Sequence, residues 1–332
     1  MNLVTGATGY IGNVLVKELV KRGESVRVLA LPGEDLLPID GMDVEVVRGN
    51  VCDPASLDTA FEGVDVVFHL AGVISITSSK DPIVHHVNVE GTKNMIDAAL
   101  RAGVKRFIYT SSIHAFKRIP HGNLIDETTP IDPAFNIADY DRSKAEATLT
   151  VLNRVKDGLP AVIVCPTGVI GPYDYKNSEL GSVMSSWMLN KVNYMIDGSY
   201  DFVDVRDVAN GLILAREKGN IGQLYILSGT LVRVSDLWKI AQELFSLKSI
   251  LVNIPVNLAR FSAFFAELYY KISKTTPKFT RYSIETLQSN AVISNLKARL
   301  YLGYNSRPLQ ETVRDTINWW KQNLSLRKNK GK

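Results

Sequence analysis

Tyr140 and Lys144 are four residues apart, a spacing that suits proton transfer. Residues four apart lie on one face of a helix, so this phenol and this ammonium would lie side by side. The unperturbed pKa of tyrosine is about 10, and a neighbouring ammonium stabilises the phenolate and lowers that pKa. We therefore predict that Lys144 lowers the pKa of Tyr140 and that Tyr140 acts as a general acid or base.

Three glycines near the start of the chain form a second candidate site. Gly6, Gly9 and Gly12 follow a short apolar run, where a strand would turn into a helix. Glycine permits a tight turn at Gly6, close approach of the backbone to phosphates at Gly9 and close helix packing at Gly12. Because the N-terminus of a helix attracts anions, the pattern predicts a site for the pyrophosphate of a dinucleotide. An ordinary turn is the alternative, since a glycine triplet alone is a weak signal. The spacing G-x-x-G-x-x-G, rather than G-x-G-x-x-G, indicates one particular branch of dinucleotide binders.

Both segments belong to an ordered series of motifs. The others are HLAG at 69–72, NVEGT at 88–92, YTSS at 109–112, PTGVIGP at 166–172, DFVDVRDV at 201–208 and LGY at 302–304. The series spans almost the whole chain and resembles the extended short-chain dehydrogenase/reductase family, within the NAD-dependent epimerase/dehydratase superfamily. The segment at 166–172 and the carboxyl-terminal part look most similar to dihydroflavonol-4-reductase-like and hydroxysteroid-dehydrogenase-like members.

The hydrophobic pattern supplies the elements that must position these motifs. Strands are expected at 2–4, 25–29, 44–48, 64–70, 106–110 and 161–165, and helices at 11–21, 55–61, 83–102 and 140–156. The strands are rich in Val and Ile with few polar positions, which indicates burial by helices on both faces. We predict an α/β fold, a Rossmann-type doubly wound parallel sheet with a smaller, mainly helical carboxyl-terminal substrate lobe.

Interruptions of this alternation predict a discontinuous second lobe. We expect an NAD(P)-binding domain at 1–172, to which 203–230 returns, a substrate-binding lobe at 173–202 and 231–326, and a basic tail at 327–332. The cleft between the lobes should lie at the carboxyl ends of the strands, where ligands bind in open α/β sheets.

The resemblance implies roles for four catalytic residues. Tyr140 would exchange a proton with a substrate hydroxyl or carbonyl, while Lys144 binds the nicotinamide ribose and tunes Tyr140. Ser112 would hold the substrate oxygen, with the adjacent Ser111 as the alternative. Asn88 would orient the active-site backbone or a water, with a buried capping residue as the structural alternative.

The resemblance also implies the cofactor contacts. Asp53 matches the residue that contacts the adenine amino group in relatives, and a helix cap before Pro54 is an equal and compatible role. Ala71 and Gly72 match the loop that passes the cofactor ribose. The expected cofactor-binding set is Gly6, Thr8, Gly9, Tyr10, Ile11, Gly12, Val51, Cys52, Asp53, Leu70, Ala71, Gly72, Tyr140, Lys144, Pro166 and Thr167.

The residues after the second predicted strand leave NAD and NADP both open. An acidic residue about 20 positions beyond the glycine turn favours NAD, and an Arg there accommodates NADP. Ala30 occupies the position of the acid that favours NAD, and Leu31 occupies the position of the Arg that is common in NADP-using reductases. Arg27 would help to bind a phosphate, whereas Glu34 and Asp35 would oppose it.

Tyr200 bears on the substrate class. Relatives that act on nucleotide sugars commonly carry an Arg directly before the Asp-Phe of this motif, and Arg suits a diphosphate. Tyr at position 200, and the Met-rich and aromatic stretch at 184–195, favour a less polar substrate, although core packing is the main use expected for that stretch. The expected substrate contacts are Ser112, Tyr173 and Tyr200.

We predict an NAD(P)-dependent oxidoreductase that interconverts a carbonyl and an alcohol on a small, relatively apolar substrate. A nucleotide-sugar epimerase or dehydratase is the alternative within enzymes. A dinucleotide-binding sensor without catalysis is the alternative of another class. The presence of Ser112, Tyr140 and Lys144 together favours catalysis over the sensor.

Composition argues against several other partners. The net charge of +4 over 332 residues shows no basic stripe of the kind that binds nucleic acid. Cys52 and Cys165 provide no disulfide framework, and the five histidines, including His85 and His86, lack metal-ligand spacing, so no metal is expected.

Membrane contact and export are also not expected. The aromatic segment at 261–270 is interrupted by charge and is too short to span a bilayer. The first strand begins next to Met1, which leaves no room for a targeting peptide and predicts a cytoplasmic location. The resemblance further implies a homodimer through the helices at 83–102 and 140–156.

Overall fold

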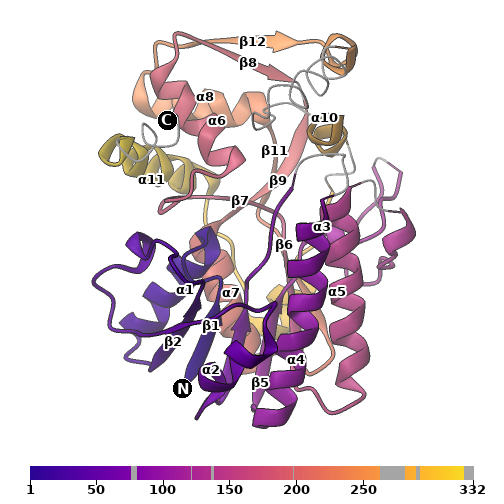
Figure 1. The fold of residues 1–332 in the computed structure, drawn as a ribbon. Helices are drawn as coiled ribbons and strands as arrows, with labels where there is room; N and C mark the ends of the chain where they lie inside the picture. Colours follow the sequence, from indigo (N-terminus) through magenta and orange to yellow (C-terminus); the bar gives the residue numbers. More distant parts are fainter. Residues whose placement is uncertain are drawn as a thin grey trace.

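The chain folds into a lower lobe built on a large sheet and an upper lobe of small sheets and helices (Figure 1). The computed structural model describes residues 1–75, 81–120, 122–135, 138–196, 198–261, 281–288 and 292–324. The predicted tail at 327–332 and most of the aromatic segment at 261–270 lie outside the described residues.

The large sheet has seven parallel strands in the order β10-β6-β5-β4-β1-β2-β3. The strand order reverses between β1 and β4, and ligands bind at such a switch point in open α/β sheets. The predicted doubly wound fold is therefore confirmed. The strands are β1 (Asn2–Thr5), β2 (Val26–Ala30), β3 (Glu45–Arg48), β4 (Val66–His69), β5 (Arg106–Thr110), β6 (Ala161–Pro166) and β10 (Leu224–Leu227).

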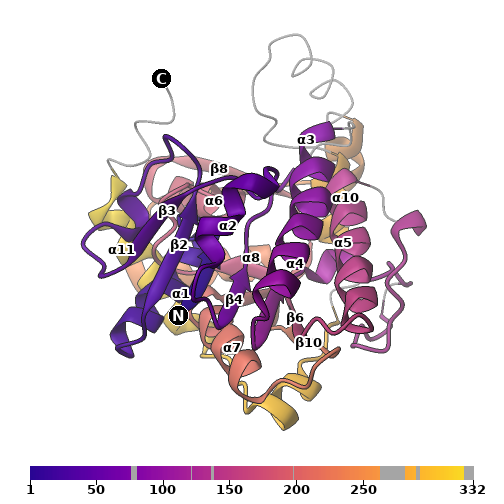
Figure 2. The ribbon, with the colours of Figure 1, turned by 60° about the horizontal axis from the view of Figure 1, so that its bottom comes forward.

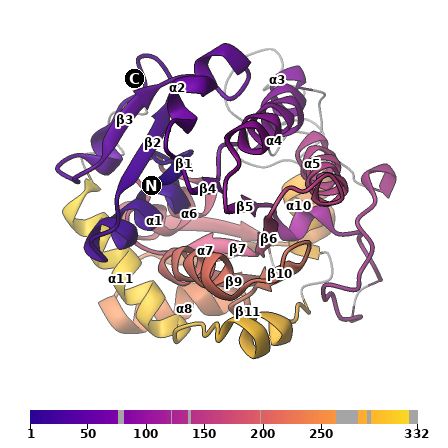
Figure 3. The same cartoon turned by 90° about the horizontal axis from the view of Figure 1, so that it is seen from below.

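Helices cover both faces of this sheet. Helices α1 (Tyr10–Lys21) and α7 (Val205–Lys218) pack together on one face, and α4 (Gly91–Ala102) and α5 (Asp139–Val155) on the other (Figures 2 and 3). Successive strand residues point to opposite faces, so Leu3 belongs to the core under α4 and Val4 to the core under α1. Two covered faces explain why the strands contain so few polar residues.

The helix predicted at 83–102 is confirmed, and it contains one π-helical turn. It consists of α3 (Pro82–His85), a π-helical turn at His86–Glu90 and α4. Within the π-turn, the hydroxyl of Thr92 donates to the carbonyl of Asn88 at 2.6 Å, and the Asn88 side chain bonds the backbone of Val73. The π-turn itself was not predicted, because side-chain hydrogen bonds of this kind compete with regular helical bonding and hydrophobic periodicity does not report them.

The upper lobe contains strands as well as helices. Its first sheet has the order β11-β9-β7, and its second pairs β12 with β8. These elements are β7 (Gly168–Ile170), β8 (Val192–Ile196), β9 (Ser199–Asp204), β11 (Thr230–Arg233), β12 (Ile250–Ile254), α6 (Glu179–Leu189), α8 (Val234–Phe245), α10 (Arg281–Gln288) and α11 (Leu309–Gln322).

Two segments lie across the predicted domain boundaries, which remain predictions. Strand β7, inside the predicted first domain, pairs with β9 of the upper lobe. The turn at Ala298–Leu302, inside the predicted second lobe, packs on α7 of the lower lobe. Between these elements, the carboxyl ends of the large sheet face the upper lobe (Figure 1).

Candidate active site

The glycine turn joins β1 to α1 in a shape that only glycine allows. Gly6 has φ +68, in the left-handed region, and a Cβ there would lie 2.8 Å from the backbone nitrogen of Ala71. A Cβ on Gly12 would lie 2.1 Å from the Gly6 carbonyl oxygen. Helix α1 begins after Gly9 with no side-chain cap, so the amides of Tyr10 and Ile11 in its first turn suit an anion. The turn fits the pyrophosphate of a dinucleotide.

The segment after β7 lies over the start of α1. The Tyr10 hydroxyl donates to the carbonyl of Gly171, and the Asn13 amide donates to the carbonyl of Tyr173 at 3.2 Å. The ammonium of Lys17 lies 4.1 Å from the centre of the Tyr173 ring. Tyr173, expected to contact substrate, therefore packs on α1, and its contact with substrate stays a prediction.

A carboxylate closes the other side of the glycine turn. Glu34 accepts hydrogen bonds from the Thr8 hydroxyl, from the Lys176 ammonium at 2.9 Å and from the Leu31 amide at 3.0 Å. Burial alone would raise the pKa of Glu34, but the bonds from Thr8 and Lys176 outweigh it and lower that pKa. Glu34 therefore stays ionised beside the turn. It lies four residues after Ala30, the position at which an acidic residue would favour NAD.

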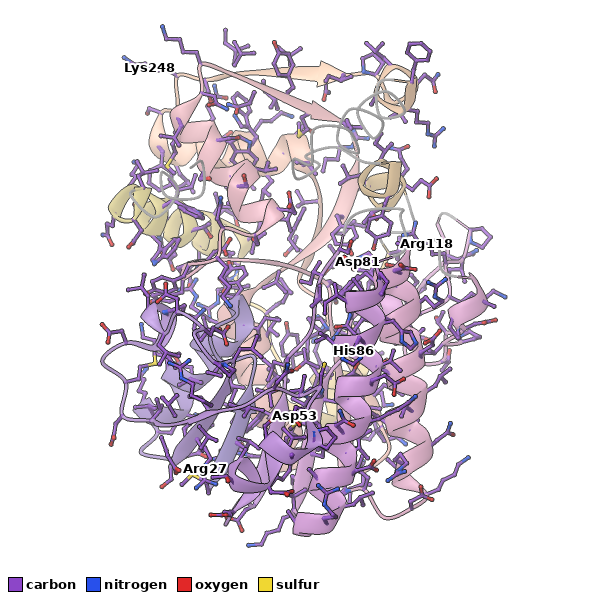
Figure 4. All side chains as sticks on the ribbon, in the orientation of Figure 1. Arg27, Asp53, Asp81, His86, Arg118 and Lys248 are labelled. Atoms are coloured by element: carbon purple, nitrogen blue, oxygen red, sulfur yellow. The ribbon has the colours of Figure 1, made fainter. Side chains whose placement is uncertain are left out.

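Arg27 does not face this site. Its guanidinium donates to the carbonyls of Ala60 at 3.1 Å and Glu62 at 2.5 Å, at the end of α2 (Asp58–Phe61). It also pairs with Glu45 at 3.0 Å, and Figure 4 shows it at the end of the sheet away from the upper lobe. The suggestion that Arg27 helps to bind a phosphate is wrong, because these partners hold it there.

The segment at 51–53 lies between the sheet and the π-turn. Asp53 accepts from the Ala55 amide at 3.2 Å, so it is a helix cap, while its role toward adenine stays a prediction. The carbonyl of Val51 accepts from Asn94 at 2.9 Å, and the thiol of Cys52 lies 3.7 Å from the carbonyl of His86. Both cysteines of the chain are free thiols.

His69 fixes the loop at 70–72 to the glycine turn. The Thr5 hydroxyl oxygen accepts from the amides of Leu70 and Ala71 at 3.2 and 3.0 Å, so its own proton is donated to His69 Nδ1 at 2.8 Å. Thr92 donates to a carbonyl and therefore accepts from His69 Nε2 at 3.0 Å. Burial lowers the pKa of His69 to about 3 and keeps the ring neutral. Sequence reasoning used this histidine only as a landmark and missed its role.

Helix α5 carries Tyr140 and Lys144 into the cleft, both buried. The Lys144 ammonium donates to the carbonyl of Thr110 at 2.9 Å and lies 3.6 Å from where a Cβ on Gly72 would stand. Burial lowers the pKa of Lys144 to about 8. Lys144 and the loop that was expected to pass the ribose therefore meet.

The predicted lowering of the Tyr140 pKa is wrong for this structure. Burial raises the pKa of Tyr140 to about 12, the hydrogen bond with Ser112 opposes the rise, and the charge of Asp141 adds to it. The ammonium of Lys144 bonds the Thr110 carbonyl instead of the phenol. Tyr140 is consequently protonated at neutral pH and is equipped to donate a proton.

The two adjacent serines have different surroundings. The Ser111 hydroxyl is buried against the Thr148 hydroxyl at 2.6 Å. The Ser112 hydroxyl accepts from the His114 amide at 3.2 Å and bonds Tyr140. This geometry favours Ser112 as the residue that holds the substrate oxygen.

Asn88 and Thr167 act on neighbouring backbone and side chains. Asn88 accepts from the Val73 amide at 2.7 Å and donates to the Val73 carbonyl and to Ser143, both at 2.9 Å. It therefore orients the backbone after the loop at 70–72, one of the two roles expected for it. Thr167, which follows Pro166 at the end of β6, donates to Asp201 at 2.6 Å.

A pocket lies beside Tyr140 where the two lobes meet. The Tyr200 hydroxyl lies 2.9 Å from His114 Nε2 in its wall, and Figure 4 shows Arg118 at the same junction. Met184 and Trp187, in contrast, are buried in the core. The pocket is lined by Ile113, His114, Phe116, Arg118, Ile119, Ile125, Tyr200 and Ile293. Sequence reasoning named only Tyr200 among them, because no motif marks the others.

Two expected absences concern only the described residues. No cluster of three or more His, Cys, Asp or Glu in that part of the chain could hold a metal ion. Each helix in the same ranges is too short or too polar to cross a bilayer.

A glycine-built turn at a switch point, with a Tyr, a Lys and a Ser meeting beside it, defines an NAD(P)-dependent oxidoreductase of the extended short-chain dehydrogenase/reductase type. The chain belongs to the NAD dependent epimerase/dehydratase family, whose model matches residues 2–227. The family resemblance carried by the motifs is thus confirmed.

Three curated relatives align with nearly the whole chain. "Sterol demethylase protein B" of Methylococcus capsulatus is 31% identical over 96% of this chain and 98% of its own. "3beta-hydroxysteroid-dehydrogenase/decarboxylase isoform 1" of Arabidopsis thaliana is 30% identical over 95% and 78%. "Putative dihydroflavonol 4-reductase" of Synechocystis is 26% identical over 96% and 93%. Among solved structures, gox2253 superposes with a TM-score of 0.85 at 33% identity, over 97% of this chain and 98% of that one.

Proposed function

We propose that the protein is an NAD-dependent oxidoreductase that interconverts a ketone and a secondary alcohol on an apolar, ring-containing substrate. The observation that carries this proposal is that Ser112 and Tyr140 both contact His114, which lines a pocket whose walls are mostly isoleucine and phenylalanine. The sterol and dihydroflavonol names among the relatives support a ring-containing substrate.

In this proposal, the hydroxyls of Ser112 and Tyr140 hold the substrate oxygen. A dinucleotide bound at the glycine turn would supply or accept the hydride. Tyr140, protonated at neutral pH because burial raises its pKa to about 12, gives its proton to the oxygen as the carbonyl becomes a hydroxyl. Lys144, beside Gly72, would hold the nicotinamide ribose and place a positive charge near the proton that moves.

Glu34 supports NAD rather than NADP. Its ionised carboxylate is hydrogen-bonded to the glycine turn through Thr8, next to where the adenosine ribose would lie. A 2′-phosphate placed there would meet a negative charge, and the charge of Lys176 is already paired with Glu34 at 2.9 Å. A ribose hydroxyl, in contrast, can donate to a carboxylate.

The pocket gives less support to a nucleotide sugar. The cation at its wall, Arg118, pairs with the buried Asp141 at 3.2 Å, and Tyr200 bonds His114. A diphosphate needs uncompensated donors or cations, which these pairings do not supply. The sensor alternative explains neither the buried Lys144 nor the Tyr140–Ser112 contact.

A cofactor-oxidation screen tests the proposed function. Purified protein is offered NADH or NADPH with 3-oxosteroids, dihydroflavonols and simple cyclic ketones, and UDP- and dTDP-sugars are tested for protection against heat unfolding. We expect turnover of ring ketones with NADH preferred. Protection by a nucleotide sugar with no ketone turnover would contradict the proposal and favour the epimerase. The homodimer through α4 and α5 stays a prediction.

A further inference from the structure

Four side chains from distant elements form a buried polar cluster next to Tyr140. Asp141 comes from α5, His114 from the turn at Ile113–Ala115, Tyr200 from β9 and Tyr282 from α10. The His114 ring stacks on Tyr200 with centroids 6.2 Å apart, and its centroid is 6.0 Å from those of Tyr140 and Tyr282. His114 is therefore the common neighbour of all three phenols, and nothing in the proposed reaction uses it.

Asp141 is an ionised acceptor at the base of this cluster. Its side chain is fully buried, and it accepts from Arg118 at 3.2 Å and from the Tyr282 hydroxyl. Burial alone would raise the pKa of Asp141, but His114, Tyr282 and Arg118 outweigh it and lower that pKa. A carboxylate with these partners only accepts hydrogen bonds.

The surroundings of His114 decide which ring nitrogen carries the proton. Nδ1 faces the Asp141 carboxylate at 3.5 Å and the Tyr282 oxygen at 3.3 Å. Tyr282 has already donated its proton to Asp141, so both neighbours are acceptors and the proton must be on Nδ1. In the neutral ring, Nε2 is then an acceptor.

The consequence reaches the pocket through Tyr200. Its hydroxyl lies 2.9 Å from His114 Nε2 and must donate to it. The lone pairs of the Tyr200 oxygen are thus the hydrogen-bonding groups that this side chain offers to the pocket it lines. Without the histidine, the hydroxyl would rotate freely and offer either a donor or an acceptor.

We propose that Asp141 and His114 are positioning residues that fix Tyr200 as a hydrogen-bond acceptor, so that the protein selects apolar ketones or alcohols carrying a second, donating hydroxyl. This inference rests on the proposed function and names its substrate class more closely. Tyr140 and Ser112 hold the reacting oxygen, the apolar walls hold the rings, and Tyr200 holds the second hydroxyl. A substrate whose second oxygen is methylated leaves the buried Tyr200 lone pair without a donor, which costs about a tenfold loss of affinity.

Matched probes test the inference. Decalin and steroid ketones that carry a free hydroxyl are compared with their O-methyl ethers by titration calorimetry on the complex with NADH at pH 8.5. We expect the wild-type protein to bind the best hydroxyketone about ten times more tightly than its ether. Tyr200→Phe should bind the two equally. Equal binding by the wild-type protein, binding of neither probe, or an unchanged preference in Tyr200→Phe would each overturn the inference.

Asp141→Asn tests whether the preference for the hydroxyketone depends on the direction of the hydrogen bond between Tyr200 and His114 or only on how the cluster packs. Because Arg118 is only a donor, the amide oxygen should face Arg118 and the amide nitrogen should face His114. The ring proton then moves to Nε2, and the Tyr200 proton turns toward the pocket. We expect the preference for the hydroxyketone to be lost or reversed in favour of the ether. An undiminished preference in a folded Asp141→Asn protein would contradict the proton direction.

Tyr304→Phe is the matched control. Tyr304 is also buried, but its hydroxyl donates to the Ser228 carbonyl at 3.1 Å, outside the cluster, so this variant should keep the wild-type preference. Loss of preference in the control would overturn the assignment to Tyr200. Thermal unfolding checks that every variant is folded. Since the readout is binding, a preference without turnover would contradict only the proposed function, and turnover without a preference would contradict only this inference.

Discussion

The cofactor half and the substrate half of the cleft are assembled differently. In the cofactor half, Gly6 and Gly12 contact each other within one turn of chain. In the substrate half, His114 meets Tyr200 and Tyr282 across sequence separations of 86 and 168 residues. A steric requirement within one turn leaves a short motif in the sequence, whereas a polar cluster between lobes leaves only scattered residues.

Tyr140→Phe should have the largest effect, because it removes the proton donor that both halves share. We expect turnover to fall by about a hundredfold or more, the usual contribution of a positioned acid or base. Affinity for NADH, measured by fluorescence titration, should stay near the wild-type value. Near-normal turnover would remove Tyr140 from the mechanism.

Gly12→Ala should damage the cofactor half alone. A Cβ 2.1 Å from the Gly6 oxygen forces the turn apart, and overpacking of this kind costs about 2 kcal/mol, or roughly a thirtyfold loss of NADH affinity. Gly103→Ala is the control, since Gly103 has φ +63 with nothing within 4 Å of its Cβ position. The control should lose about 1 kcal/mol of stability and no affinity. Equal NADH affinity in both variants would contradict the role of the turn.

Substitutions of Ser111 and Ser112 test whether these adjacent residues have different roles, one in stability and one in catalysis. Ser112→Ala should lower kcat by about tenfold, as expected for a lost hydrogen bond to the reacting oxygen. Ser111→Ala should instead lower the free energy of unfolding by about 1 kcal/mol, because it removes the buried hydrogen bond between the Ser111 and Thr148 hydroxyls, which lie 2.6 Å apart. Steady-state kinetics and urea unfolding distinguish the two. A reversed pattern would assign the substrate oxygen to Ser111.

His69 should make the cofactor half sensitive to acid. Its pKa is about 3 in the folded protein because of burial, against about 6.5 in the unfolded chain. The contribution of His69 to the free energy of unfolding is therefore fully present above about pH 6.5 and is lost progressively as the pH falls toward 3. The reason is that His69 binds a proton in the unfolded chain but stays neutral in the folded protein. Between pH 7.5 and 5.5 this costs about 1.4 kcal/mol. Urea unfolding at both pH values measures this decrease in the free energy of unfolding. His69→Gln should no longer show it, whereas the exposed control His85→Gln should. Equal decreases in the two variants would contradict the buried neutral ring.

The sequence predicted those parts of the molecule that short-range sterics determine. The strands at the core of the sheet, the glycine turn and the helix carrying Tyr140 and Lys144 follow from apolar runs and fixed spacings. The pKa of Tyr140 could not be predicted in the same way, because burial outweighs a neighbour four residues away. Glu34 was named, but its bonds to Thr8 and Lys176 depend on how two loops and the upper lobe meet.

One measurement tests most directly the claim that the glycine turn and Tyr140 serve the same reaction. A ring ketone is reduced with NADH stereospecifically deuterated at the nicotinamide C4, and the product is analysed by mass spectrometry and NMR. The account predicts one deuterium on the carbinol carbon, on one face only, at a rate that falls about a hundredfold in Tyr140→Phe. A carbinol carbon without deuterium, or the same rate of transfer without the Tyr140 hydroxyl, would contradict it.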